Sequence, residues 1–208
     1  TYPMPAAARK ECTGIEVGAA VHTNNMSVKI VNAGQQEKEF KEDNNQALVE
    51  PQYFQLFQDY QWLAGSQKNA LNEPYQVVLT ESRAKIYFGD IAPAEALGRE
   101  VIYQDSLRTT VSGVVADWKQ PSDFDFTDYI SSATIEKSWL KENFALTEWG
   151  STTSSSQFFI KLKKGVPTER ILKQFEQLSA KYNKDEDIKM KIAYLLQPLS
   201  DIHFNIEL

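Results

Sequence analysis

An apolar stretch that leads directly into a helix lies in the middle of the sequence, at residues 77–89. Val77-Val-Leu79 is short and apolar, as in a strand that is buried inside a sheet. Thr80 stands at the position of a helix N-cap, and Gly89 ends the helix-forming run over 81–88. The pattern predicts a buried strand followed at once by a helix, so a sheet and a helix must pack together.

Strand and helix patterns alternate in this way twice. One strand–helix–strand block covers about 46–88, and the other covers about 157–196, where Pro167 opens an amphipathic helix. The stretch between the blocks is rich in strand-forming residues. We therefore expect an α+β fold with a discontinuous outer subdomain and an inserted one. The predicted boundaries are 1–92 with 155–208 for the outer subdomain and 93–154 for the strand-rich insert.

The remaining local patterns predict further short elements. Pro3 and Pro5 precede good helix formers, so we expect a helix at about 4–12. Residues 15–21 and 26–31 alternate apolar and polar side chains, which predicts two strands joined by a turn at 23–25. Elsewhere we expect strands at 100–103, 108–116, 126–130, 157–162 and 189–196, a helix at 135–140, and loops at 59–72 and 150–156.

The charge balance and the single cysteine exclude several classes of protein. Of the 208 residues, 22 are basic and 28 acidic, and the net charge of −6 argues against binding along a nucleic-acid backbone. Cys12 is the only cysteine, so neither an intrachain disulfide nor a thiolate metal cluster can form. No apolar run approaches the roughly 18–20 residues of a membrane helix, and the start at Thr1 lacks signal-peptide features. We expect an excised fragment or a processed chain.

Residues that could catalyse a reaction or hold a metal form no recognised pattern. His22 and His203 are the only histidines, and neither has a second ligand at metal-binding spacing. The carboxylates of residues 123–128 alternate with aromatic residues and lack the glycine of a calcium loop. Glycine-rich nucleotide loops and nucleophile motifs are also missing. The sequence therefore predicts no catalytic residue, no cofactor, no cofactor-binding residue and no metal ligand.

Two groups of side chains keep alternatives open. A pair of carboxylates would suit a hydrolase, and the candidates are Asp117, Asp123, Asp125 and Asp128. A set of aromatic residues at helical spacing is either a partner-binding surface or, more often, part of the core; its members are Tyr53, Phe54, Phe57 and Trp62.

Seven stretches, in a fixed order, carry a family resemblance. The three strongest are Val77-Val-Leu-Thr-Glu-Ser-Arg-Ala-Lys-Ile-Tyr-Phe-Gly-Asp90, Ala96-Leu-Gly-Arg99 and Thr110-Val-Ser-Gly-Val-Val-Ala-Asp117. Four others agree with them: Val49-Glu-Pro-Gln-Tyr-Phe54 with Leu56-Phe57, Gly65 with Ala70-Leu71, Phe158-Phe-Ile-Lys-Leu-Lys-Lys-Gly165, and Leu196-Gln-Pro-Leu-Ser-Asp-Ile-His203. Together they resemble the extracytoplasmic domain of MacB/FtsX-type ABC permeases, in the branch common in Bacteroidetes-type bacteria. The resemblance spans nearly the whole chain and is loosest at 122–126 and 135–155.

The resemblance implies a periplasmic core domain between the first and second membrane helices of a permease subunit. It implies a porter-like α/β subdomain built from the two outer blocks, with an inserted, strand-rich, Sabre-like subdomain. Such a domain is not a catalyst. In this family a separate ATP-binding subunit or domain hydrolyses ATP and moves the membrane helices, and the periplasmic domain transmits that motion. Gly89, Gly98 and Gly113 fit the family pattern, and we interpret them as caps, turns or close contacts.

The resemblance also implies the partners of the protein. They are the ATP-binding subunit and a periplasmic adaptor, lipoprotein or peptide substrate, with no nucleic acid. The full-length protein would be membrane-embedded and dimeric, and the isolated domain monomeric. The motion would serve export, lipoprotein handling or a periplasmic partner. The alternative function is a free-standing periplasmic binding or adaptor protein, because the lack of catalytic motifs suits it equally.

Overall fold

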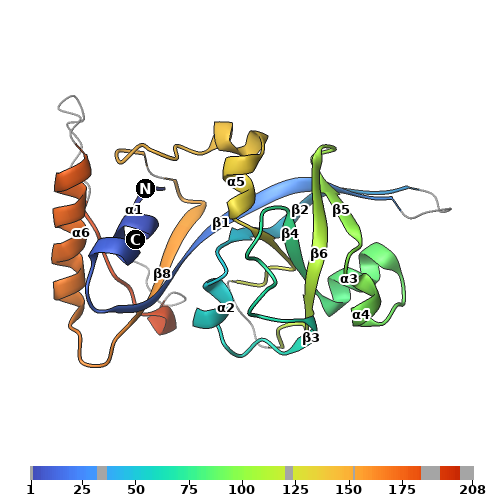
Figure 1. Ribbon diagram of the computed structural model, residues 1–208, viewed down its shortest axis with the longest axis horizontal. Coiled ribbons are helices and arrows are strands. Elements are labelled where there is room, and N and C mark those ends of the chain that lie inside the picture. Colours follow the sequence, from blue (N-terminus) through green and yellow to red (C-terminus); the bar gives the residue numbers. More distant parts are fainter. Residues whose placement is uncertain (1, 32–36, 120–123, 152, 184–192, 202–208) are drawn as a thin grey trace.

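Helices pack against one mixed sheet of eight strands (Figure 1). The computed structural model describes residues 2–31, 37–119, 124–151, 153–183 and 193–201. The strands are β1 (Ile15–Ile30), β2 (Lys38–Val49), β3 (Trp62–Gly65), β4 (Gln76–Thr80), β5 (Glu100–Tyr103), β6 (Leu107–Val115), β7 (Asp128–Ser131) and β8 (Ser156–Leu162). The helices are α1 (Met4–Glu11), α2 (Tyr53–Leu56), α3 (Glu81–Phe88), α4 (Pro93–Ala96), α5 (Ala133–Lys137) and α6 (Thr168–Tyr182), with 3₁₀ helices η1 (Trp139–Asn143) and η2 (Leu199–Asp201). The predicted α+β class is confirmed.

The long strand β1 changes partner along its length. Its first half, from Ile15 to His22, pairs with β8. Its second half pairs with β2 on one edge, as far as Ile30, and with β5 on the other edge at Val28 and Lys29. One strand therefore runs from one end of the molecule into the other (Figure 1).

The turn predicted at residues 23–25 is wrong, because β1 continues through it. Thr23 and Asn24 pair with β2, and the register then shifts between Asn24 and Met26. The asparagines therefore accommodate a β-bulge instead of a hairpin turn. The same residue types favour turns and bulges, so the pairing with distant strands decides between the two.

Six strands pair in a closed ring, in the order β1, β2, β7, β4, β6, β5 and back to β1. The β2–β7 and β4–β6 pairs are parallel, and the other pairs are antiparallel. Alternate residues of these strands form one buried cluster, which includes Val28, Leu79, Tyr103 and Ile130. We call this ring, together with α2, α3, α4 and α5, the barrel lobe.

The other end of the molecule contains α1, α6, β8 and the first half of β1, and we call it the helical lobe (Figure 1). Its helices pack on the sheet through a separate buried cluster formed by Met4, Ala8, Ile171, Phe175 and Leu178. The buried residues of α6 recur at the helical spacing that the sequence predicts. In the part of the chain that the structure describes, no helix has the length and apolar character needed to cross a membrane.

Most of the predicted elements are present. The unit at 77–89 is β4 followed by α3, and the Thr80 hydroxyl accepts a hydrogen bond from the Arg83 amide at the start of the helix. Gly89 ends α3 with a φ of +88°. The helix predicted at 4–12 is α1, and the strands predicted at 100–103, 108–116, 126–130 and 157–162 are β5, β6, β7 and β8. The helix predicted at 135–140 is divided between α5 and η1.

β3 lies within residues 59–72, which the sequence predicts to be a loop. It pairs with β6, where Gly113 leaves room for Trp62: a Cβ at Gly113 would lie 2.6 Å from the indole ring. The close contact predicted at Gly113 is therefore confirmed. Gly65 has a φ of +73°, and a Cβ there would lie 2.4 Å from the carbonyl oxygen of Ser112. These contacts come from a strand some fifty positions further along, which no local pattern reveals.

Two predictions reach beyond what the structure tests. The strand predicted at 189–196 falls partly outside the described residues, and residues 193–196 form no strand. The boundaries 1–92 with 155–208 and 93–154 stay a prediction. Among the described strands, β4, which precedes residue 92, pairs with β6 and β7, which follow it.

Candidate functional site

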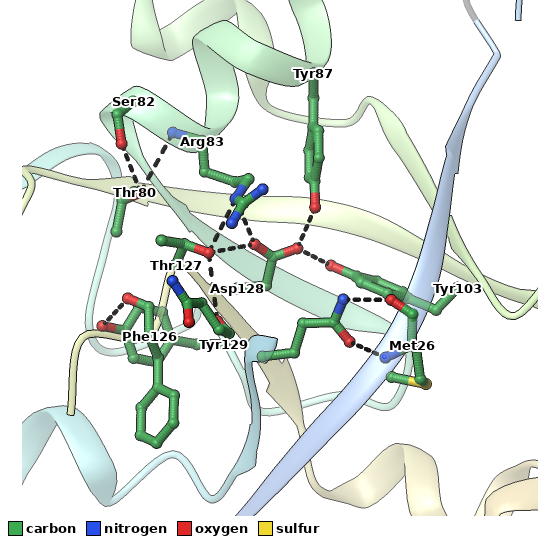
Figure 2. A network of polar contacts seen from close by, with 12 residues as sticks. Met26, Thr80, Ser82, Arg83, Tyr87, Tyr103, Phe126, Thr127, Asp128 and Tyr129 are labelled. Carbon is green, nitrogen blue, oxygen red and sulfur yellow. Dashed lines mark hydrogen bonds and ion pairs between the residues drawn. The ribbon is translucent and has the colours of Figure 1, made fainter. Parts of the chain in front are cut away.

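A buried carboxylate lies at the start of β7, inside the barrel lobe. The side chain of Asp128 is fully enclosed, and its Oδ2 accepts hydrogen bonds from the hydroxyls of Tyr87 at 2.8 Å and Tyr103 at 2.7 Å. Its Oδ1 lies 3.0 Å from the Thr127 hydroxyl and 3.2 Å from Nε of Arg83. Figure 2 shows the carboxylate between these donors. Four side chains thus converge on one acceptor group: two come from α3, one from β5 and one from the residue that precedes β7.

The helix α3 and the strand β5 position these donors. Arg83 and Tyr87 are four residues apart in α3, so they share one face of the helix. Tyr103 is the last residue of β5. Arg83 also donates from Nε to the Thr127 hydroxyl at 2.9 Å, which links the guanidinium to the same strand. The cluster therefore holds α3 and two strands in one arrangement.

Burial governs the electrostatics of this cluster. Desolvation raises the pKa of the Asp128 carboxyl, and the Arg83 guanidinium and the hydroxyl donors oppose that rise. Burial also raises the pKa of Tyr103 well above its usual range, so this hydroxyl stays protonated as a donor. Because the carboxylate is enclosed and its oxygens are occupied by side chains of the protein, we expect it to hold α3, β5 and β7 together and not to bind a substrate.

The carboxylates proposed for a hydrolase do not converge in the described residues. Asp128 is buried in the cluster just described. Asp117 is exposed and accepts a hydrogen bond from the Ser82 amide at 3.1 Å, at the beginning of α3. Asp125 is exposed, and Asp123 lies outside the described residues. The described members therefore form no pair of the kind that acid–base hydrolysis needs.

Burial shifts the pKa values of both His22 and Cys12. His22 is buried, and its Nδ1 lies 2.7 Å from the Ser156 hydroxyl. Burial lowers the pKa of His22 to about 4, so the ring is neutral at pH 7. Cys12 caps the C-terminus of α1, and burial raises the pKa of its thiol. Within the described residues, no three His, Cys, Asp or Glu side chains lie close enough together to hold a metal ion. His203 is not among the described residues.

The aromatic residues that follow β2 belong mainly to the core. Tyr53 and Phe54 are buried and pack on Tyr129 of β7, with ring centroids 5.5 Å and 5.2 Å away. Phe57 and Trp62 are half-buried at the edge of the same cluster. Tyr53 and Phe54 are therefore core residues, and they cover the outer face of the six-stranded ring.

An ion pair joins α1 of the helical lobe to the end of β2 in the barrel lobe. The two terminal guanidinium nitrogens of Arg9, Nη1 and Nη2, each donate a hydrogen bond of 2.6 Å to the carboxylate of Glu50. The same carboxylate accepts a hydrogen bond from the Ala20 amide of β1 at 2.7 Å. Glu50 therefore links α1, β1 and β2 at the junction of the lobes. The sequence gives no signal for this pair, because its members are 41 positions apart.

The sequence of the chain also matches a known protein family. The sequence pattern of the MacB-like periplasmic core domain matches residues 1–178 of this chain. The chain belongs to this family. A comparison with curated proteins gives no match.

Solved structures share the fold of this MacB-like domain. A domain of a protein described as a permease from Porphyromonas gingivalis has 19% sequence identity and a TM-score of 0.69, covering 89% of this chain and 72% of the other. The periplasmic region of MacB from Actinobacillus actinomycetemcomitans has 19% identity and a TM-score of 0.60, covering 86% and 74%. The extracellular domain of the noncanonic ABC-type transporter YknZ from Gram-positive bacteria has 13% identity and a TM-score of 0.58, covering 88% and 84%.

Membership of the MacB-like family indicates the location of the chain in the cell and the kind of protein to which it belongs. It is an extracytoplasmic domain of an ABC transporter permease, and the family implies an association with an ATPase subunit. Domains of this family are generally not catalysts. The family therefore favours the permease hypothesis over a free-standing binding protein.

Proposed function

We propose that this MacB-like domain transmits motion mechanically from membrane helices to a periplasmic partner or substrate. ATP hydrolysis would take place in the associated ATPase subunit, and the domain would move as a connected body. Its partner would be an adaptor, a lipoprotein or a peptide substrate. In this proposal the full-length permease is a membrane-embedded dimer.

The single observation that carries the proposal is that β1 belongs to both lobes. Its residues Ala19 and Val21 are fully buried near β8 and α2, while Met26, Val28 and Ile30 are buried inside the ring. A displacement of the helical lobe therefore acts on the barrel lobe through a hydrogen-bonded strand and not through a flexible linker. Such a strand resists bending because both of its edges are paired near the junction.

Two further features support a connected body. The Arg9–Glu50 ion pair lies beside β1 and closes a second link between the lobes. Tyr2, which precedes α1, and Leu196, which follows α6, line the same cavity, so the first and last described segments lie together in the helical lobe. A domain that receives force from membrane helices at both of its ends needs this arrangement.

The proposal is tested in the full-length permease with its ATPase, reconstituted in nanodiscs. In a Cys12→Ser background, a donor dye is placed on Ser106→Cys in the barrel lobe or on Lys173→Cys in the helical lobe; both positions are exposed. Acceptor dyes on the lipid headgroups report the height of each lobe above the membrane. We expect ATP to change the energy transfer from both dyes.

A Gly-Ser-Gly insertion between Asn24 and Asn25 provides the decisive variant, because it interrupts β1 at its bulge. We expect the ATP-dependent change to persist at position 173 and to become smaller at position 106, where the Arg9–Glu50 pair and the pairing of residues 21–24 with β2 still connect the lobes. The same insertion between Lys164 and Gly165, in the turn after β8, is the matched control and should leave both signals intact. Motion at position 173 without motion at 106 in the uninterrupted protein would rule out transmission through β1. No motion at either position would rule out the mechanical role.

A further inference from the structure

A cavity of about 730 Å³ lies between the helical lobe and η1. Its walls come from α1, β1, β8, α6, η1 and residues 193–196. This volume falls within the range of roughly 300–1,000 Å³ that is usual for small-molecule sites. The cavity is separate from the Asp128 cluster, none of whose members lines it.

Among the described residues that line this cavity, His22 and the tyrosines are the only ionisable side chains. Among the described lining residues there is no Asp, Glu, Lys or Arg, although 24% of the whole chain consists of these residues. Aromatic rings such as those of Phe144, Phe158 and Phe175 share the surface about equally with neutral polar groups, and Asn143 lies at the exposed edge. A charged ligand would lose its hydration here and gain no opposite charge. The lining therefore selects an uncharged occupant.

His22 lies in the wall of this cavity. Its ring is 4% exposed and stacks on Tyr2 with centroids 5.1 Å apart, while Phe144 meets it edge-on at 5.2 Å. Nδ1 is engaged by the Ser156 hydroxyl, and no described residue hydrogen-bonds Nε2. The pKa of His22, lowered by burial to about 4, keeps this ring neutral at pH 7. On the same cavity wall, the buried hydroxyl of Tyr194 also has no partner among the described residues.

We infer that this cavity binds an uncharged aromatic small molecule whose polar group forms a hydrogen bond with Nε2 of His22. The inference goes beyond the mechanical role and does not depend on it. The aromatic walls supply the contact area, and the single imidazole nitrogen orients the ligand. The same lining discriminates against anions and cations of similar shape.

Two fluorescent probes that share an aromatic body test this selectivity on the 208-residue chain. N-phenyl-1-naphthylamine is uncharged and has one N–H donor, whereas 8-anilinonaphthalene-1-sulfonate adds a sulfonate to the same rings. Both become brighter in an apolar environment. We expect saturable binding of one molecule of the uncharged probe per chain, and binding of the sulfonate that is at least about tenfold weaker.

Variants that fill the cavity locate the bound probe. Ala145→Trp and Asn143→Trp each place an indole at the lining, and Ala94→Trp on exposed α4 is the matched control. We expect both cavity variants to lose binding of the uncharged probe and the control to keep it. His22→Phe keeps an aromatic ring but removes both imidazole nitrogens, including the one that contacts Ser156, and it should weaken binding by about fivefold. Circular dichroism establishes folding for each variant, and Asn143→Trp decides if Ala145→Trp does not fold.

Three results would overturn the inference. The first is no saturable binding of the uncharged probe. The second is binding that survives in the folded cavity variants, which would place the probe elsewhere on the surface. The third is equal affinity for the uncharged probe and the sulfonate, which would contradict selection by the lining. Unchanged affinity in a folded His22→Phe variant would remove the hydrogen bond from the assignment.

Discussion

Arg9 of α1 and Glu50 after β2 form a two-point ion pair across the junction between the lobes. Their side chains are 29% and 18% exposed, so the pair is only partly hydrated. The Glu50 carboxylate also accepts a hydrogen bond from the Ala20 amide of β1. One carboxylate thus sets the position of α1 relative to the strand that both lobes share.

We expect Arg9→Ala to lower the free energy of unfolding by about 1–2 kcal/mol, because it leaves the Glu50 carboxylate half-buried without its cation. The exposed Arg108–Glu100 pair, with side chains 64% and 42% exposed, supplies the control. Arg108→Ala should cost less than about 0.5 kcal/mol, since solvent screens that pair. Urea unfolding of the isolated domain measures both changes. Equal losses in the two variants would contradict a special role for Arg9.

Removal of the buried carboxylate should cost more than removal of the ion pair. Asp128→Ala leaves the Arg83 guanidinium without its enclosed anion, and we expect a loss of about 3–5 kcal/mol in unfolding free energy. Asp128→Asn keeps the shape and one acceptor oxygen, so it should cost about 1–3 kcal/mol. The exposed Asp125→Asn serves as a control and should change stability by less than about 0.5 kcal/mol. An Asp128→Ala variant as stable as the control would show that the cluster does not stabilise the fold.

The buried His22 should make the domain less stable in acid. Its pKa is about 4 in the folded chain, against the usual value of 6.5. Below pH 6.5 the unfolded chain therefore takes up a proton that the folded chain does not, and stability falls as the pH drops from 6.5 to about 4. The full contribution of this group is about 3 kcal/mol.

The His22→Phe variant tests this contribution, because it replaces the titrating imidazole with a ring that cannot take up a proton. Chemical unfolding of both proteins at several pH values between 7.5 and 4 gives the difference in stability. That difference should shift in favour of the variant as the pH falls. A difference that is independent of pH would show that His22 is protonated equally in the folded and unfolded chains.

Two glycines with similar backbone angles should tolerate alanine differently. Gly65 and Gly98 have φ values of +73° and +79°, but a Cβ at Gly65 would lie 2.4 Å from the Ser112 carbonyl oxygen, whereas a Cβ at Gly98 meets nothing within 4 Å. Gly98→Ala should cost about 1 kcal/mol, from backbone strain alone. Gly65→Ala should cost about 3 kcal/mol or more, because β3 must also move away from β6. Thermal unfolding compares the two, and equal shifts in Tm would refute the steric argument.

Local signals in the sequence predict the elements that are determined locally. Thr80 and Gly89 mark both ends of α3, because capping depends on residues next to the helix. The alternation in residues 123–128 also predicts that Asp125 is exposed and Phe126 buried, although both precede β7 and lie in no strand. Such features require no knowledge of the rest of the fold.

Features that depend on pairing between residues far apart in the chain cannot be predicted from local sequence patterns. The alternation gives no sign that Asp128 is enclosed, since its donors Arg83, Tyr87 and Tyr103 come from other elements. The continuation of β1 through Asn24 is equally hidden, because β2 and β8 supply the partners on either side of the bulge. The cavity is hidden for the same reason: its walls come from segments at both ends of the chain and from its middle.

The two edges of β1 acquire their partners at different times during synthesis. Val21 lies between Val49 on one edge and Gln157 on the other. A chain that emerges N-terminus first can complete the pairing with β2 long before β8 exists, and contacts between distant residues form slowly. The edge of β1 that pairs with β8 therefore stays open until residues 156–162 have been made. An open strand edge can pair with other chains, so we expect the incomplete domain to aggregate more readily than the finished one.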